Sequence, residues 1–478
     1  MKRKRRVKIL ATLGPSSSEE QIIQQLYEAG ADTFRINMSH SSHDTMRELI
    51  ARIRHVEKNV GYPIGILADL QGPKHRLGTF VDEKISINAG DFIVLDSNPE
   101  PGDNTRVFLP HPEVMAALKP GHRLLVDDGR ATLIVESCAE GSVTAKVISG
   151  SSLSNRKGVS LPDTELATSS LTKKDLADLD AILKEDVDWV ALSFVQRPED
   201  LAEMRRICRG RVGVLAKIEK PQAVEKLDDI IELADCIMVA RGDLGVELPL
   251  ESVPAIQKQI IRKCRRAGIP VIVATQMLES MITSPVPTRA EVSDVATAVY
   301  EGADAVMLSA ESAAGKYPIE AVSTMSAIAR NVEQDTNYPG IINAQRPEPK
   351  ATGADAISLA VRQIAETLNL SAVVCYTATG STGLRTARER PTTPILALSP
   401  IPETARRLTL VWGLHSVITP DAKDLDEMVD KACHIAFEEG FANPGDRVII
   451  SAGVPLRTPG STNMLRIAYV DSDGMGGI

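Results

Sequence analysis

Charged side chains interrupt apolar, strand-like runs of this 478-residue chain, at positions where they could do chemistry. In the run VLAKIE, Lys217 and Glu219 stand two residues apart, so on a strand both side chains point to the same side. Asp243 follows the next run, between Gly242 and Gly245, which would let the backbone turn tightly and approach a ligand. Two carboxylates with no histidine or cysteine nearby suit a hard divalent ion. We therefore expect Glu219 and Asp243 to bind Mg²⁺ or Mn²⁺; a structural ring of salt bridges is the alternative.

Basic side chains follow two earlier runs. Arg35 and Asn37 share one face of TFRINM, and arginine offers a planar fork for phosphate. Asp69 ends the next run, so that an ion pair between Arg35 and Asp69 is the alternative, and Lys74 and Arg76 come shortly after it. Basic groups around two carboxylates suit phosphoryl transfer, in which a protein positions the group and stabilises spread negative charge. Neither a P-loop nor the protein-kinase signatures occur, so another scaffold must hold this site.

The scaffold that fits is a (β/α)8 TIM barrel. Eight short apolar runs alternate with helical stretches, at residues 8–13, 33–38, 65–70, 189–194, 214–219, 236–241, 271–276 and 305–310. Nearly every run ends in polar residues, among them Ser193, Thr275 and Ser309. Because active sites of such barrels lie where the strands end, these side chains are expected to cluster.

Two further units are expected beside the barrel. Roughly a hundred residues separate the third run from its helix, which is too long for a structureless loop, and they contain short alternating strands. They predict a small all-β lid domain over the active site. After a Pro-rich linker, a second α/β pattern predicts a C-terminal doubly wound α/β domain. The expected boundaries are 1–72 and 162–345 for the barrel, 73–161 for the lid and 346–478 for the C-terminal domain.

Composition excludes several classes of function. Lys plus Arg number 54 and Asp plus Glu 63, a net charge of −9, and aromatic residues make up 3%, so nucleic acid is not an expected partner. The apolar runs are far shorter than the ~20 residues of a membrane helix, and no signal-peptide core follows the basic residues 2–6. Six scattered cysteines without a C-x-x-C pair predict buried, reduced thiols, which is typical of a cytoplasmic protein.

Ten motifs together resemble the pyruvate kinase family, and the similarity runs from about residue 7 to residue 470. They are KILATLGPSS, FRINMSH, LQGPKHRLG, KGVSLP, LSFV, KIEKPQAV, MVARGDLGVELP, ATQMLESM, PTRAEVSDVATAV and MLSAESAAGKYP. The resemblance implies transfer of phosphate from phosphoenolpyruvate to ADP, giving pyruvate and ATP in glycolysis. It also implies a Mg²⁺ or Mn²⁺ cofactor and a cytoplasmic homotetramer.

The resemblance further implies roles for single residues. Glu219 and Asp243 match the metal ligands. The residues that match catalytic positions are Lys217, Arg35, Arg76 and Thr275. Those that match substrate contacts are Arg35, Lys217, Gly242, Asp243, Thr275 and Ser309, with Glu311 in support. Those that match nucleotide contacts are Asn37, His40, Arg76 and Lys157. Thr275 lies near the carbon that gains a proton, and either Thr275 or an ordered water is left open as the donor.

One region departs from the commonest family pattern. Many members need K⁺, bound by groups that match Asn37, Ser39, Asp69 and Leu70, with a glutamate at the position of Lys74. Here Leu70 and Gln71 replace the usual threonine and lysine, and Lys74 replaces that glutamate. An ammonium carries about the charge of a bound K⁺. We expect Lys74 to replace the monovalent cation, so that K⁺ is not required; a surface lysine is the alternative.

In the C-terminal domain, the run AVVCYT leads into TATGSTG and then a helical pattern. Hydroxyls and backbone N–H groups at the start of a helix make an anion site. The residues that resemble the family's effector loop are Thr377, Thr379, Gly380, Ser381 and Thr382, and we expect residues 453–463 to close over them. A sugar phosphate or a nucleotide is the expected effector, and an ordinary turn is the alternative.

Two other functions compete with the pyruvate kinase interpretation. A metal-dependent lyase or aldolase acting on pyruvate-like enolates would share the two carboxylates and an arginine, but would not need a lid with Lys157. A non-catalytic sugar-phosphate sensor would use only the C-terminal domain, and predicts loss of Lys217, Glu219 or Asp243. All three of these residues are present.

Overall fold

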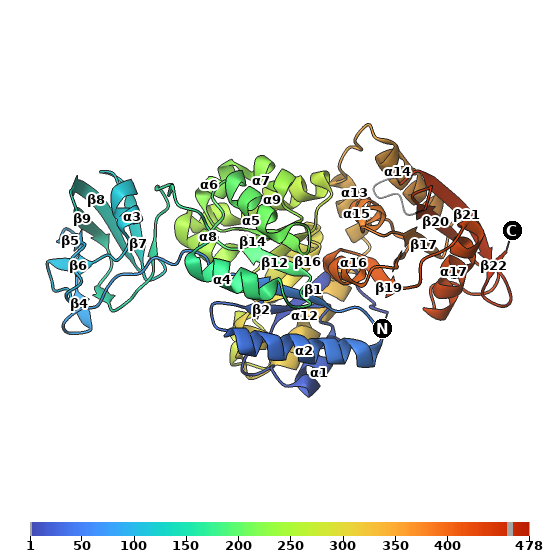
Figure 1. Ribbon diagram of the computed structural model, residues 1–478, viewed down its shortest axis with the longest axis horizontal. Coiled ribbons are helices and arrows are strands. Elements are labelled where there is room, and N and C mark those ends of the chain that lie inside the picture. The colour runs from blue at the N-terminus through green and yellow to red at the C-terminus, as the bar shows by residue number, and fades with distance from the viewer. Residues whose placement is uncertain (1, 457–461, 478) are drawn as a thin grey trace.

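The computed structural model describes residues 2–456 and 462–477, which form three units in a row (Figure 1). The barrel lies in the middle, the lid on one side of it and the C-terminal domain on the other. Both termini lie on the side of the C-terminal domain. Within the described residues, no helix is both long and apolar enough to cross a membrane.

The central unit is a closed barrel of eight parallel strands, counted over the described chain, in the order β1-β16-β15-β14-β13-β12-β3-β2. The strands are β1 (Lys8–Thr12), β2 (Thr33–Asn37), β3 (Gly65–Asp69), β12 (Trp189–Leu192), β13 (Gly213–Ile218), β14 (Cys236–Ala240), β15 (Val271–Ala274) and β16 (Ala305–Leu308). They are nearly continuously apolar because both faces of a barrel strand are covered. The predicted TIM barrel is confirmed.

Helices surround the barrel. They are α1 (Glu20–Ala29), α2 (His43–Val60), α4 (Lys173–Ile182), α5 (Pro198–Cys208), α6 (Pro221–Glu225), α7 (Leu227–Leu233), α8 (Arg241–Glu247), α9 (Val253–Ala267), α10 (Arg289–Tyr300), α11 (Ala310–Ala313), α12 (Pro318–Glu333) and α13 (Tyr338–Ala344), with short 3₁₀ turns at Leu250–Ser252 and Glu279–Ile282. Side-chain caps fix several starts. Thr172 and Thr288 form capping boxes with Asp175 and Glu291.

The lid is a six-stranded sheet in the order β11-β7-β8-β9-β5-β6 beside a two-stranded sheet of β10 and β4. Its elements are β4 (Lys84–Ser86), β5 (Phe92–Asp96), β6 (Arg106–Phe108), α3 (Pro112–Ala117), β7 (Arg123–Val126), β8 (Ala131–Ala139), β9 (Ser142–Ser149), β10 (Ser152–Ser154) and β11 (Val159–Ser160). The lid is not purely β: it includes the short helix α3, which no periodicity in the sequence indicated. Cys138, on β8, is exposed, so the expectation of buried thiols is wrong at this position.

The C-terminal domain has a six-stranded sheet in the order β19-β18-β17-β20-β21-β22, whose first four strands are parallel. Its elements are α14 (Gly353–Thr367), β17 (Ala372–Tyr376), α15 (Ser381–Arg388), β18 (Ile395–Ser399), α16 (Pro402–Arg407), the 3₁₀ helix η3 (Leu408–Leu410), β19 (Leu414–Ile418), α17 (Leu425–Glu438), β20 (Arg447–Ala452), β21 (Met464–Val470) and β22 (Gly476–Gly477). The predicted α/β domain is confirmed.

The C-terminal domain closes the floor of the barrel, opposite the strand ends that carry the polar residues. Leu410 of η3 packs among the side chains that fill the barrel interior, such as Leu10, Leu67 and Met238. Next to it, the hydroxyls of Thr409 and Thr33 are 2.8 Å apart. This contact leaves the carboxyl ends of the strands open toward the lid.

Candidate active site

Lys217 and Glu219 come together at the end of β13, as the spacing of two residues predicts. Nζ of Lys217 lies 2.8 Å from Oε1 of Glu219, 3.5 Å from Oδ1 of Asp69 and 2.9 Å from Oγ of Ser193. Burial alone would lower the pKa of Lys217, but the carboxylates of Asp69 and Glu219 outweigh it and raise the pKa above its usual value. Lys217 is therefore a buried ammonium at neutral pH.

Glu219 is fully buried, and only one of its two carboxylate oxygens accepts a hydrogen bond from the described residues. Its Oε2 accepts a hydrogen bond of 2.7 Å from the backbone N–H of Phe194. Besides the ion pair with Lys217, its Oε1 has no hydrogen bond to any residue that the structure describes. Burial raises the pKa of Glu219, because a buried charge loses its solvation.

The donor set here fits a divalent ion. Asp243, in the first turn of α8, lines the same cleft as Glu219. Two carboxylates, one with an oxygen left without a hydrogen bond from the described residues, are the ligands that Mg²⁺ or Mn²⁺ takes in proteins.

Arg35, in the middle of β2, is both a cleft residue and a member of an ion pair. Its guanidinium contacts Oδ2 of Asp69 at 2.6 and 2.7 Å and donates to Oγ1 of Thr12 at 3.1 Å. Although burial would raise the pKa of Asp69, Lys217 and Arg35 hold it below its usual value. Arg35 also lines the cleft. The ion pair that the sequence left as an alternative thus exists, and it fixes Arg35 at the cleft.

Thr275 follows β15 with a φ of +71°, which is a strained backbone conformation for a β-branched residue. Its Oγ1 accepts a hydrogen bond of 2.7 Å from the N–H of Gly242 and donates one of 2.6 Å to the carbonyl of Ala274. A Cβ at Gly242 would lie 3.4 Å from that Oγ1, an ordinary contact distance, so the hydrogen bond does not itself require glycine. The turn expected at Gly242 and Gly245 is wrong, however, because both residues lie within helix α8.

The side chain of Arg241 holds the strained backbone at Thr275 in place. Its guanidinium forms a two-pronged ion pair with Asp294 of α10, at 2.5 and 2.6 Å, and donates to the carbonyl of Thr275 at 2.8 Å. Sequence reasoning gave Asp294 no role, because no local signal links two residues 53 positions apart.

Ser193 and Phe194 are two further cleft residues to which sequence reasoning assigned no role. Ser193 is buried, accepts a hydrogen bond from Lys217, and donates at 2.8 Å to the carbonyl of Leu70. Phe194 has a φ of +55° and holds Glu219 through its backbone N–H. The polar end of the fourth run was a signal for Ser193, but its contact with Lys217 emerges only when the barrel closes.

Most of the remaining predicted residues line two adjoining hollows. The first, of about 100 Å³, is lined by the residues of the expected monovalent-cation site and by Ser309, an expected substrate contact. The residues at the expected cation site are Asn37, Ser39, Asp69, Leu70, Gln71 and Lys74. Glu311 accepts hydrogen bonds from the N–H groups of Ser309 and Leu278 at 2.7 and 3.1 Å, which fixes the backbone at Ser309.

The second hollow, of about 390 Å³, lies between barrel and lid and shares Lys74, Phe194 and Asp243 with the first. Arg76 and Lys157 both line it. The guanidinium of Arg76 donates to the carbonyl of Arg156 at 2.9 Å, and Lys157 pairs with Asp127 at 2.9 Å. His40 is exposed and lines neither hollow.

The loop predicted to bind an effector starts helix α15. Gly380 has a φ of +87°, and its N–H donates to Oγ1 of Thr377 at 2.9 Å. Oγ1 of Thr379 lies 3.2 Å from Oγ of Ser381. The hydroxyls of Thr382 and Thr462 are 2.9 Å apart, so one end of the loop expected to close over this site reaches it. Residues 457–461 of that loop lie outside the described residues.

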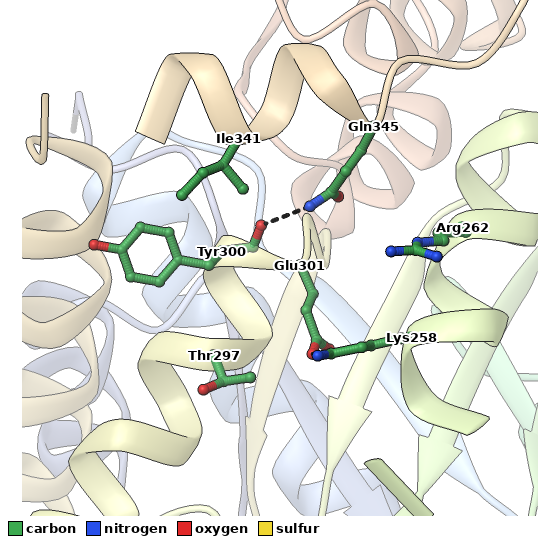
Figure 2. Close-up of a pocket in the computed structure, with 7 residues that line it drawn as sticks. All are labelled: Lys258, Arg262, Thr297, Tyr300, Glu301, Ile341 and Gln345. Carbon is green, nitrogen blue, oxygen red and sulfur yellow. Dashed lines mark hydrogen bonds and ion pairs between the residues drawn. The ribbon is translucent and has the colours of Figure 1, made fainter. Parts of the chain in front are cut away.

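A third pocket lies on the side of the barrel, where α9, α10 and α13 meet (Figure 2). Lys258 pairs there with Glu301 at 3.6 Å, and the side-chain amide of Gln345 donates to the carbonyl of Tyr300 at 3.3 Å. None of the predicted site residues lines this pocket, so it is separate from the cleft around Lys217.

Comparisons with known proteins agree with this geometry. The family model "Pyruvate kinase, barrel domain" matches residues 4–322, and "Pyruvate kinase, alpha/beta domain" matches residues 355–468. A pyruvate kinase of Methylorubrum extorquens is 59% identical, with 98% of each chain covered, and one of Agrobacterium vitis is 48% identical over 97% of this chain and 98% of its own.

Among solved structures, a pyruvate kinase from Cryptosporidium parvum superimposes with a TM-score of 0.91 at 31% identity, covering 98% of this chain and 96% of the other. These matches decide against the lyase or aldolase and against a non-catalytic sensor. Whole-length identity of this order, on a scaffold that joins Lys217 to Glu219 at the barrel mouth, shows that the chain belongs to the pyruvate kinase family of phosphotransferases.

Proposed function

We propose that the cleft around Lys217 transfers the phosphoryl group of phosphoenolpyruvate to ADP. The observation that carries this proposal is the meeting of Lys217 and Arg35 with Glu219 and Asp243 in one cleft, which adjoins the hollow beneath the lid. The cations suit a phosphate and a carboxylate, and the second hollow has room for a nucleotide.

Arg35 and Lys217 hold the transferring phosphoryl group, and their positions are set before substrate enters. Asp69 lies between them and contacts both, so neither side chain needs to reorganise when charge develops. After transfer, the ammonium of Lys217 stabilises the enolate oxygen. The enolate carbon takes up its proton on the side of the cleft where Thr275 lies.

Glu219 and Asp243 would hold Mg²⁺ or Mn²⁺. Such an ion supplies positive charge that neutralises phosphate oxygens during transfer. Arg76 and Lys157 would contact the nucleotide phosphates across the second hollow. Asn37 lines the first hollow and His40 lines neither, so the lining of the second hollow does not support their expected nucleotide contacts. Because Arg76 and Lys157 belong to the lid, closure of the lid would bring these contacts to the cleft.

The test is release of pyruvate from phosphoenolpyruvate, with and without ADP, in the presence of Mg²⁺. Glu219→Gln and Asp243→Asn should each lower kcat by about 100-fold or more, because each removes charge where the metal binds. Glu251→Gln, an exposed carboxylate next to α8, is the matched control and should keep full turnover. Full turnover in the first two variants would contradict the assignment.

Activity without K⁺ is part of the same proposal. Lys74 lines the cleft together with Asn37, Ser39 and Asp69, and so it can supply a positive charge where relatives bind a monovalent cation. Turnover should be unchanged when K⁺ is replaced by a large inert cation such as tetramethylammonium. A collapse of the rate in that buffer would reject the role of Lys74.

Two variants sharpen this test. Lys74→Glu should lower turnover and make the remaining rate rise with K⁺. The double variant Gln71→Lys with Lys74→Glu should recover more of the rate, again only with K⁺. An equal, K⁺-independent rate in all three proteins would show that Lys74 is an ordinary surface lysine.

We further propose a cytoplasmic homotetramer whose C-terminal domain binds a phosphorylated effector at residues 377–382. The hydroxyls and N–H groups gathered at the start of α15 support an anion there. Sugar phosphates and nucleotides added singly should shift the phosphoenolpyruvate saturation curve, and Thr382→Ala should weaken the shift. Sedimentation at equilibrium tests the tetramer.

A further inference from the structure

The segment that enters the lid from the barrel passes a cluster of two histidines and a glutamate. His75 stands on that segment between Lys74 and Arg76, whereas His111 and Glu113 stand at the start of α3. Figure 1 shows α3 within the lid. The proposed function gives these three side chains no role, although His75 lines the second hollow.

Their spacing is that of a metal site. Nδ1 of His75 lies 3.8 Å and Nδ1 of His111 3.5 Å from Oε1 of Glu113, and one ligand atom of each of the three residues lies within 4.8 Å of the others. Tetrahedral ligands at 2.0–2.2 Å from Zn²⁺ are about 3.3–3.5 Å apart. Small movements of the two rings would therefore bring three ligand atoms to tetrahedral positions around Zn²⁺, with water as the fourth ligand.

One of the three ligand atoms has no other partner in the described part of the chain. Nδ1 of His75 is buried and has no hydrogen-bond partner among the described residues. This nitrogen is therefore available as a ligand for a metal ion.

We propose that His75, His111 and Glu113 bind a borderline transition-metal ion such as Zn²⁺ or Co²⁺, which ties the entry segment of the lid to α3. Two nitrogens and one carboxylate favour these ions over Mg²⁺, which prefers oxygen ligands. The site is thus chemically distinct from the carboxylate pair at Glu219 and Asp243.

Metal binding would act on the neighbouring Arg76. In the structure, the backbone N–H of Arg76 donates to Nε2 of His111 at 3.0 Å, so the proton of that neutral ring is on Nδ1. When a metal ion takes Nδ1, the proton moves to Nε2, which can then no longer accept. The bond to Arg76 breaks, and this consequence rests on the proposed nucleotide contact of Arg76.

Co²⁺ added in the presence of saturating Mg²⁺ tests the site itself. A tetrahedral site with nitrogen ligands gives Co²⁺ a strong visible absorption band, whereas an octahedral all-oxygen site gives a weak one. We expect one equivalent of strong band in the wild-type protein and at least about a 100-fold loss of affinity in His75→Ala and in Glu113→Gln. His55→Ala, an exposed histidine on α2, should retain the band.

The site would be disproved by a weak band in the wild-type protein, or by a strong band that survives in His75→Ala with an unchanged circular dichroism spectrum. A second measurement separates this proposal from the proposed function. Zn²⁺ should raise the KM for ADP in the wild-type protein and not in His75→Ala. If the Co²⁺ band is present and KM does not move, the metal site holds and the role given to Arg76 fails.

Discussion

The contact between Ser193 and Lys217 offers a direct measure of how much the position of that ammonium contributes to turnover. Oγ of Ser193 accepts from Nζ of Lys217 at 2.9 Å and donates to the carbonyl of Leu70 at 2.8 Å. Ser193→Ala removes both bonds and leaves Lys217 with its two carboxylate partners, Glu219 and Asp69. Nothing else in the cleft changes in size or charge.

The size of the effect follows from the kind of bond lost. A hydrogen bond to a charged group contributes about 1.5–3 kcal/mol, and each 1.36 kcal/mol in the barrier is tenfold in rate. We therefore expect kcat of Ser193→Ala to fall by about 10- to 150-fold, with little change in the KM for ADP. Steady-state pyruvate release at saturating phosphoenolpyruvate measures this.

Ser312→Ala is the matched control. Ser312 is fully buried at the same end of the barrel and donates to the carbonyl of Thr12 at 2.8 Å, but does not contact Lys217. Both variants lose a hydroxyl-to-carbonyl bond and should lose similar thermal stability. A kcat for Ser193→Ala within about threefold of that for Ser312→Ala would refute the view that Ser193 positions the ammonium.

Three further predictions concern stability and the strained turn. Burial lowers the pKa of Lys8 to about 8 in the folded protein, whereas in the unfolded chain this lysine keeps its proton up to the usual pKa of 10.5. The free energy of unfolding should therefore rise between pH 8 and pH 10.5, by up to about 3 kcal/mol relative to Lys8→Met. Denaturant unfolding at several pH values measures this. Leu410→Ala should cost about 2–5 kcal/mol because it opens a cavity in the barrel floor, whereas Leu250→Ala, at an exposed leucine, should cost almost nothing in the same melts. Asp294→Asn weakens the ion pair that holds Arg241 and should lower kcat by roughly 5- to 30-fold, equal to about 1–2 kcal/mol, without lowering the melting temperature comparably.

The barrel could be predicted from sequence because its strands are buried on both faces and read as apolar runs. The pairing of Lys217 with Glu219 followed from the two-residue repeat of a strand, which holds whatever surrounds it. Contacts between side chains on different strands could not be predicted from the sequence. Nothing local to Ser193 shows that it lies beside Lys217, 24 residues away along the chain.

Predictions based on neighbouring residues were wrong where the same residues are compatible with both a turn and a helix. The segment RGDLGVE directly follows β14 and contains two glycines, which favour a turn. Residues 241–247 nevertheless form a helix. Arg241 and Asp243 stand in its first turn and take opposite roles: Arg241 reaches back to Asp294, and Asp243 lines the cleft. In the lid, strands of two or three residues carry too few side chains to show any periodicity.

The departures from the common family pattern at positions 70, 71 and 74 depend on one another. In the common family pattern, a lysine at position 71, a glutamate at position 74 and a bound K⁺ sum to one positive charge; here Gln71 is neutral and Lys74 alone supplies the same charge. Leu70 is buried and lines the cleft where a hydroxyl would otherwise meet the ion, so a dehydrated K⁺ would face an alkyl group. A single Lys74→Glu change removes two positive charges and K⁺ can return only one, so full recovery requires Gln71→Lys as well. The proposed loss of the K⁺ requirement would therefore be a property of the three positions together.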